Sequence, residues 1–396
     1  MRTSSVFVIV ALATVTCFSL ATEPPKLKPA AELPEIKGLP NPFTFSDGSP
    51  VRTVLDWEKR RLELKNLFQD YEYGHLPAKP KAMTIVLGEL ITDDANKVTI
   101  QEHELKLAND DKTMTMRLRL VMPQDAKGPV PVVIQSGFGA GKKGPPTGKP
   151  YAVFTQRGYA VAECYFNEVA IDNKDRARTA GIYKLFDDKI DCGGLMAWAW
   201  GVYRVIDALE TMPKIDIKKI VVTGHSRYGK ATLIAGAFDD RIALTVPSHS
   251  GCGGCAPYRF IYGKNEQLHN VVGAFPYWFR PDFTQFVGKV DRLPVDQHLL
   301  TALVAPRAFL GTEGTQDTWI NPEGAQLTYQ AAKKVYDFLK ASDKISIRYR
   351  PVGHIPSNED LLDYADHVFF QKALPEEFGK LPYENEKNGF TWDVPK

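Results

Sequence analysis

One serine lies in a segment whose residue types and spacing suit nucleophilic chemistry. Ser226 stands within Gly-His-Ser-Arg-Tyr-Gly, residues 224–229, after the apolar run that begins at Ile220 and before a predicted helix at 230–237. A serine on a sharp strand-to-helix turn is lifted above the edge of a sheet, where a base can reach its hydroxyl. The helix N-terminus also favours developing negative charge. The segment predicts a nucleophile rather than an ordinary turn, although Gly229 follows the serine by three residues where two are usual.

A nucleophilic serine needs a base and a carboxylate that orients the base. Where such a serine lies at the edge of a parallel sheet, each partner follows a later strand, in the chain order serine, acid, histidine. His354 follows the last predicted strand and is expected to take the proton from Ser226. Asp317, in the loop after the preceding strand, is expected to fix the His354 tautomer, with Glu313 of the same loop as the alternative.

The negatively charged intermediate of acyl transfer needs hydrogen-bond donors. The backbone N–H of Arg227, the residue after the serine, is the expected donor. We also expect the Arg227 guanidinium to add a permanent positive charge. The glycine-rich loop at residues 137–141 could supply a further N–H, although its simplest interpretation is a tight turn.

The elements around these residues alternate between buried strands and helices from Val130 onward. Besides the strand before Ser226, we expect strands at 83–90, 97–107, 114–122, 130–135, 159–165, 241–247, 307–311 and 345–349, and helices at 57–73 and 194–211. Such alternation predicts a parallel sheet covered on both faces. Antiparallel strands that come first in the chain and join such a sheet are typical of an α/β-hydrolase. The predicted fold class is therefore α/β, an α/β-hydrolase with a three-layer αβα sandwich around a mostly parallel central sheet.

The first residues bear on the compartment in which the protein acts, and the net charge bears on its partners. Arg2, a mostly apolar run and small residues at 19–21 predict a signal peptide over residues 1–21, with an uncleaved anchor as the alternative. Residues 22–50 predict an extended N-terminal arm, and residues 51–396 one α/β-hydrolase catalytic domain. We expect a secreted or periplasmic protein with no membrane segment after cleavage. The net charge of +2 gives no reason to expect a nucleic-acid partner.

Cleavage after residue 21 would leave four cysteines, Cys164, Cys192, Cys252 and Cys255. An even number in an oxidising compartment permits up to two disulfides, with three possible full pairings. The segment from Cys252 to Cys255 has no second C-x-x-C and no histidine pair at zinc-finger spacing. We therefore expect no metal site.

Residues 224–230, Gly-His-Ser-Arg-Tyr-Gly-Lys, resemble the G-C-S-R-x-G-K elbow of the glucuronoyl esterases, which share the displaced glycine. The resemblance includes segments 197–202, 250–254, 275–279, 293–300 and 305–307, and extends to His354. It implies hydrolysis of the ester between 4-O-methyl-glucuronic acid on xylan and lignin alcohols. The acyl-enzyme would form on Ser226, without a metal or organic cofactor. The resemblance further implies that Lys230 binds uronate hydroxyls and that Glu266 and Trp319 bind and pack on the sugar ring.

Two positions depart from the fungal pattern of that family. Fungal members have a cysteine where this chain has His225, and a glutamate after the next strand where it has His249. Members of the bacterial branch often carry the acid in the later loop, which favours Asp317. His249 is expected to contact the substrate, with a hydrogen bond to the triad as the alternative.

Two other functions fit part of the pattern. An acetyl-xylan or other carbohydrate esterase on the same fold would use the same triad, and only Lys230, Glu266 and Trp319 argue for a uronate. A catalytically silent carbohydrate-binding protein is disfavoured because serine, acid and histidine occur in the expected order. We expect a monomer whose partner is a glucuronoxylan or lignin-carbohydrate ester substrate.

Overall fold

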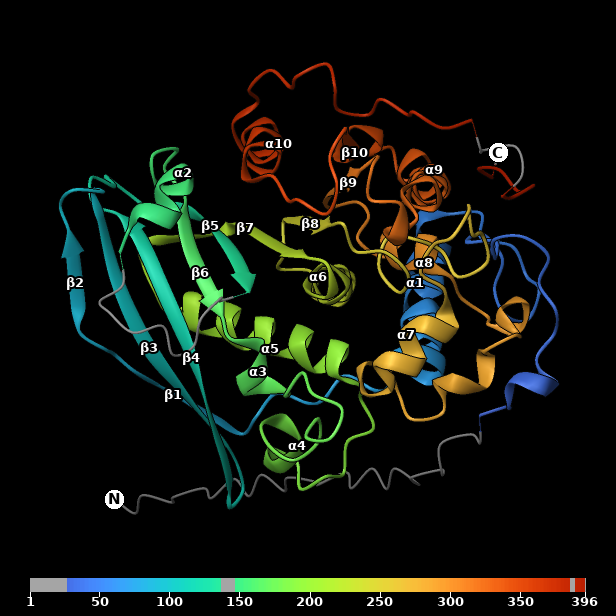
Figure 1. Cartoon of the computed structure of the whole chain (residues 1–396), viewed down its shortest axis with the longest axis horizontal. Helices are drawn as coiled ribbons and strands as arrows, with labels where there is room; N and C mark the ends of the chain where they lie inside the picture. Colours follow the sequence, from blue (N-terminus) through green and yellow to red (C-terminus); the bar gives the residue numbers. More distant parts are fainter. Residues whose placement is uncertain (1–26, 137–146, 385–388, 396) are drawn as a thin grey trace, which may run out of the picture.

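The computed structural model describes residues 27–136, 147–384 and 389–395. Within these residues one ten-stranded sheet has the order β1-β3-β4-β6-β5-β7-β8-β9-β10, and β2 also pairs with β3 (Figure 1). The strands are β1 Ala82–Val86, β2 Leu90–Asp93, β3 Val98–Asn109, β4 Lys112–Pro123, β5 Val130–Ser136, β6 Ala160–Cys164, β7 Ile215–His225, β8 Leu244–Ser248, β9 Ala308–Gly314 and β10 Ile345–Arg350.

The sheet has two halves of different character. From β6 to β10 in the sheet order, neighbouring strands are parallel, whereas β1 to β4 pair antiparallel and β4 joins β6 antiparallel. Every residue of β6, β8 and β9 is buried, as expected for parallel strands covered on both faces. In β4 buried residues alternate with exposed or half-buried ones, as in a sheet with one wet face.

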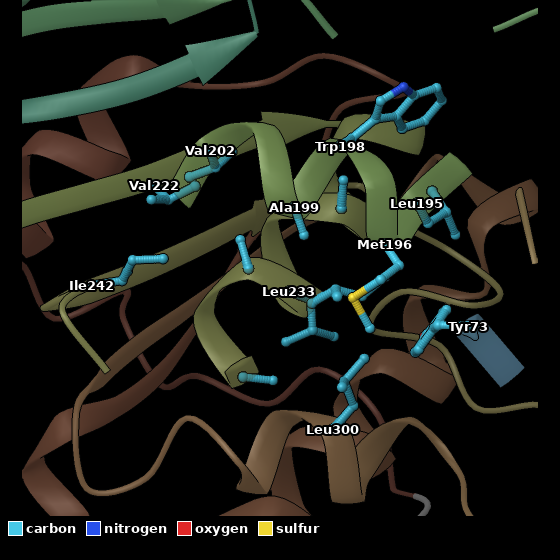
Figure 2. Close-up of a cluster of buried hydrophobic side chains, with 14 of the residues drawn as sticks. Tyr73, Leu195, Met196, Trp198, Ala199, Val202, Val222, Leu233, Ile242 and Leu300 are labelled. Atoms are coloured by element: carbon cyan, nitrogen blue, oxygen red, sulfur yellow. The ribbon is translucent and has the colours of Figure 1, made fainter. Parts of the chain in front are cut away.

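Helices form a layer on each face of the sheet. They are α1 Val54–Phe68, α2 Ala152–Thr155, α3 Phe166–Val169, α4 Ile182–Leu185, α5 Gly194–Leu209, α6 Arg227–Phe238, α7 Leu268–Ala274, α8 Gln297–Ala302, α9 Pro322–Phe338 and α10 Asn358–Phe370. α5 is buried along its whole length. Figure 2 shows Met196 of α5 beside Leu233 of α6 and Leu300 of α8. Because α2 and α10 join the core of the opposite face, the predicted three-layer arrangement is confirmed.

Several predicted boundaries differ from the structure. The strand expected at 83–90 is two strands, β1 and β2, because the antiparallel pairing with β3 is interrupted around Gly88 and resumes shifted by one residue, from Val86 opposite Glu104 to Leu90 opposite Gln101. α1 begins at Val54 because Thr53 and Asp56 form a capping box. It ends at Phe68, and a π-helical turn follows it. β7 begins five residues before the apolar run that marks it in the sequence.

The described part of the predicted N-terminal arm, residues 27–50, lies against the body of the protein. Leu39 and Phe43 are buried, and the Leu39 carbonyl accepts a hydrogen bond from the Trp392 indole at 2.9 Å. The predicted signal peptide, residues 1–21, lies outside the described residues. Of the helices in the described ranges, none is long and apolar enough for a membrane span.

Candidate active site

Ser226 occupies the turn between β7 and α6 in a backbone conformation that few non-glycine residues adopt. Its φ is 58° and its ψ is −126°, which costs roughly 1–3 kcal/mol and persists only where the surroundings enforce it. At Gly224 a Cβ would lie 2.4 Å from the Tyr228 carbonyl oxygen. At Gly229 a Cβ would lie 3.0 Å from the carbonyl oxygens of Gly224 and Ser248. Both glycines, including the displaced one, are thus needed for the helix to approach the strand.

Backbone hydrogen bonds fix this turn against the neighbouring strand. The Ser226 N–H donates to the Ser248 carbonyl of β8 at 2.9 Å. Arg227 is the first residue of α6, and the first N–H groups of a helix have no partner within it. The Arg227 N–H can therefore serve an oxyanion beside the serine. The other predicted donor, in residues 137–141, lies outside the described residues.

Two loops bring His354 and Asp317 together at the carboxyl edge of the sheet. The Asp317 Oδ2 lies 2.5 Å from the His354 Nδ1. The loops are joined where the Thr315 N–H donates to the Arg350 carbonyl at 2.9 Å. The Asp317 side chain is 9% exposed and that of His354 is 41% exposed, so the carboxylate is shielded while the imidazole meets solvent. A carboxylate on Nδ1 leaves Nε2 available to exchange a proton.

The alternative acid, Glu313, lies inside the protein on β9. Its side chain is buried, and neither carboxyl oxygen has a hydrogen-bond partner among the described residues. Burial, reinforced by the charge of Asp317, raises the pKa of Glu313 well above its ordinary value. A carboxyl group that stays protonated cannot stabilise an imidazolium as a carboxylate does. Of the two candidates, Asp317 alone has the geometry of an orienting acid.

Three imidazole rings from three segments meet beside the serine. The ring centroids of His225 and His354 are 4.2 Å apart, and that of His249 lies 5.4 Å from the former and 5.6 Å from the latter. Because His225 directly precedes Ser226, its contact with His354 brings the expected base to the elbow. His249 is fully buried, with Nδ1 3.0 Å from the Ser248 hydroxyl. In this structure His249 contacts the neighbouring imidazoles and the Ser248 hydroxyl, which favours the alternative role of supporting the triad.

Two of these imidazoles are neutral at neutral pH. Burial, together with the neighbouring histidines, lowers the pKa of His225 to about 4 and that of His249 to about 3. Neutral rings pack on His354 without adding positive charge beside the imidazolium that forms when it accepts a proton.

The Arg227 guanidinium is held by a carboxylate that the sequence did not reveal. Its Nη1 donates to the Asp172 Oδ2 at 2.8 Å. The Asp172 Oδ1 accepts from the Tyr277 hydroxyl at 2.7 Å and the Trp278 indole at 2.9 Å. These contacts orient the guanidinium and offset part of its charge. Asp172 lies in an irregular segment without a motif; the only signal was the neighbouring segment 275–279, which the family resemblance had marked.

Lys230, Glu266 and Trp319 form a second polar group. Lys230 is 4% exposed, and its Nζ donates to the Ser250 carbonyl at 2.8 Å, the Cys252 carbonyl at 2.5 Å and the Glu266 Oε2 at 3.1 Å. Since all three ammonium protons have acceptors, a sugar hydroxyl that reaches Nζ must share or displace one of them. The Glu266 N–H donates to the Trp319 carbonyl at 2.7 Å. The Trp319 side chain is 53% exposed, which leaves an aromatic face for a sugar ring.

The four cysteines of the described chain are free and buried. Burial raises the pKa of each thiol, so they behave as small apolar side chains. In the described ranges no group of three or more His, Cys, Asp or Glu residues is arranged to hold a metal ion.

The chain is similar to known esterases over most of its length. A family model described as glucuronyl esterase, fungi, matches residues 105–340. The 4-O-methyl-glucuronoyl methylesterase 1 of Phanerochaete chrysosporium is 34% identical over 320 residues, covering 77% of this chain. That stretch is 63% of the relative, so the chain spans just under two thirds of its length. The 4-O-methyl-glucuronoyl methylesterase of Schizophyllum commune is 33% identical over 374 residues, 89% of this chain and 88% of the relative.

A solved structure extends the likeness to the fold. A carbohydrate esterase family 15 glucuronoyl esterase from Caldicellulosiruptor kristjansonii has a TM-score of 0.79 and 35% identity, over 92% of this chain and 99% of that chain. The match confirms the α/β-hydrolase fold. The family model also spans the strand, turn and helix around Ser226. The chain therefore belongs to the glucuronoyl esterase family, carbohydrate esterase family 15.

Proposed function

We propose that this protein is a serine carboxylesterase that hydrolyses glucuronoyl esters linking 4-O-methyl-glucuronoxylan to lignin alcohols. The observation that carries the proposal is the pair of His354 and Asp317 packed on the elbow of Ser226. Membership of the glucuronoyl esterase family supports it, as do the names of the two relatives, both 4-O-methyl-glucuronoyl methylesterases. The proposed chemistry needs no metal or organic cofactor.

In the proposed acylation, the Ser226 Oγ attacks C6 of the uronoyl group. His354 Nε2 takes the hydroxyl proton as the bond from Oγ to carbon forms. Collapse of the tetrahedral intermediate breaks the ester bond, and His354 returns the proton to the departing alcohol oxygen. Water then attacks the acyl-enzyme with His354 again as base, which releases the uronate and restores the serine. The short contact with Asp317 supports the imidazolium in both steps.

We assign the binding of the oxyanion of the tetrahedral intermediate to the N-terminus of α6. The Arg227 N–H and guanidinium are the proposed donors, and the bond to Asp172 supports a fixed guanidinium position. Donors fixed before reaction are worth more than donors that must reorganise. One such donor typically contributes 10²–10³-fold to kcat.

Recognition of the sugar is assigned to Lys230, Glu266 and Trp319. A uronate presents several hydroxyls on one ring, and the ion pair of Lys230 with Glu266 offers both a donor and an acceptor. Glu266 is the one side chain among the three acceptors of the ammonium, so it can shift as hydroxyls bind. An acetyl group would need none of these residues.

Export and a monomeric state complete the proposal. A polymeric plant substrate lies outside the cell, which suits the signal peptide expected over residues 1–21. We propose a secreted or periplasmic monomer, within which residues 22–50 form an arm on one catalytic domain, residues 51–396.

The test is hydrolysis of benzyl glucuronate beside an acetylated xylan, with the wild type and Ser226→Ala. Cleavage of the glucuronate ester alone, lost in the variant, would support the proposal. Cleavage of acetyl groups alone would keep the triad but overturn the substrate. Binding of glucuronoxylan without any turnover would favour a silent carbohydrate-binding protein.

A further inference from the structure

A groove lies at the end of β7 opposite to the active site. It is bordered by the antiparallel strands, labelled β2 and β3 in Figure 1, and by the segment that joins α5 to β7. Its cavity volume is about 590 Å³, within the range of small-molecule sites. Ile215, the first residue of β7, lines it, whereas Ser226 directly follows the last residue of that strand. The groove is therefore separate from the catalytic edge.

His103 is an unpaired polar side chain in the wall of this groove. It lies on β3 and is 2% exposed. Neither ring nitrogen has a hydrogen-bond partner among the described residues. Desolvation lowers the pKa of His103, so the ring is neutral and carries one N–H donor and one acceptor. Leaving such a group unpaired is unfavourable, and a ligand hydroxyl in the groove would supply the missing hydrogen bond.

The rest of the groove is mainly aliphatic and partly open to water. Leu87 is 68% exposed and Leu90 is 57% exposed at its rim. Met122 and Met212, two of the seven methionines of the chain, also line it. Thioether groups make favourable contacts with aromatic rings and adapt to their shape. An apolar ring would cover the leucines, whereas a sugar would leave them without apolar contact.

We propose that this groove binds a small neutral phenol or aromatic alcohol, whose ring packs on the methionines and leucines and whose hydroxyl hydrogen-bonds to His103. A purely aliphatic chain would leave the imidazole unpaired, and a charged ligand would meet a wall that is mostly apolar apart from Lys214, at a desolvation cost. The inference rests on the groove alone. An aromatic alcohol is also the leaving group of the proposed reaction, but the groove lies away from the reacting serine.

The first test titrates 4-hydroxybenzyl alcohol into the whole protein labelled at the methionine methyl carbons and follows the methyl NMR signals. The signals of Met122 and Met212 should move saturably, while that of Met196 in the buried helix α5 should stay. Cyclohexylmethanol, of similar size but without an aromatic ring, should bind more weakly. If only Met196 moved, or no signal moved, the proposal would be overturned.

Two variants test the contacts. His103→Phe keeps a ring but removes both nitrogens, and should weaken binding about tenfold, the value of one hydrogen bond. Leu87→Asn should weaken it several-fold, and its matched control, Leu62→Asn, alters a leucine on α1 that is 62% exposed and lies outside the groove. If His103→Phe does not fold, Leu87→Asn and the wild-type methyl shifts still decide the question.

Two further results would overturn the proposal. Equal affinity in the wild type, His103→Phe and Leu87→Asn would place the probe elsewhere. A concentration-dependent dimer that excludes the probe, and that Leu87→Asn dissociates, would show that a second copy of the chain covers the groove.

Discussion

The two ends of β7 differ in how the side chains proposed to meet a ligand are held. At the carboxyl end, Lys230 has three acceptors for its three protons, and Asp172 accepts from three donors. At the other end, His103 has no partner among the described residues, and two leucines face water. Catalysis needs donors and charges fixed before the substrate arrives, whereas an apolar binding site keeps surface that the fold itself does not cover. The contrast predicts strong effects on turnover at one end and none at the other.

The largest effect is expected from Ser226→Ala. Loss of the nucleophile should lower kcat by at least about 10⁴-fold, since only donors and binding then remain. The backbone strain is unchanged, so binding of glucuronate, measured by calorimetry, should be largely retained. Turnover of benzyl glucuronate above about a hundredth of the wild-type rate would show that another residue attacks the ester.

A pair of acid variants tests which of the two candidate carboxyl groups orients His354. Asp317→Asn should lower kcat by about 10³–10⁴-fold, because the amide does not stabilise the imidazolium or its tautomer. Glu313→Gln should change kcat only a few-fold, since a protonated carboxyl group and an amide are both neutral. Steady-state rates on benzyl glucuronate measure both. Equal losses would refute the assignment of Asp317 as the acid.

Asp172→Asn tests whether a fixed guanidinium matters at the carboxyl edge. Removal of the charged partner should free Arg227 and lower kcat about tenfold or more, in line with the loss of a charged hydrogen bond. KM should change little, because the oxyanion exists only in the reacting complex. Asp175→Asn, on an exposed residue of the same segment, is the control. A rise in KM with unchanged kcat would instead assign the cluster to substrate binding.

The histidine cluster predicts a pH-dependent stability. The pKa of His249 is about 3 when folded, against 6.5 for an unperturbed histidine. Between these values the unfolded chain binds more protons, so stability is lost as the pH falls. A single group of this kind removes about 2 kcal/mol from the free energy of unfolding between pH 7 and pH 5.

His249→Gln should therefore reduce the difference between urea unfolding curves measured at the two pH values. His269→Gln, on an exposed residue, should leave that difference as it is in the wild type. An undiminished difference in His249→Gln would mean that His249 does not stay neutral in the folded state.

The smallest expected effect is that of His103→Phe on turnover. Distant sites without shared partners act independently, so kcat/KM on benzyl glucuronate should stay within about twofold of the wild type. The same variant should lose affinity for the phenolic probe. A tenfold loss of kcat/KM would show that the two ends of β7 are coupled, contrary to the independence expected of them.

The elements that carry the site were predictable to different degrees. The parallel strands were found because their residues are almost wholly apolar, and α5 was found within two residues of its observed end. The sequence did not show the break at Gly88, because the break is a shift in the pairing with another strand, β3. The sequence left the choice between Asp317 and Glu313 open. Burial of the Glu313 carboxyl group decides it, and the spacing of the two residues does not show that burial.

The sequence by itself determined the fold class, the family and the order of Ser226, Asp317 and His354 along the chain. These depend on local patterns: apolar runs, glycines at a tight turn, and motifs a few residues long. Only the tertiary structure decided the meeting of three imidazoles, the anchoring of Arg227 by Asp172 and the unpaired ring of His103. Each of these features depends on whether segments that are distant in the sequence come into contact. Charge, burial and hydrogen bonding depend on such neighbours, and they exist only once the sheet has formed.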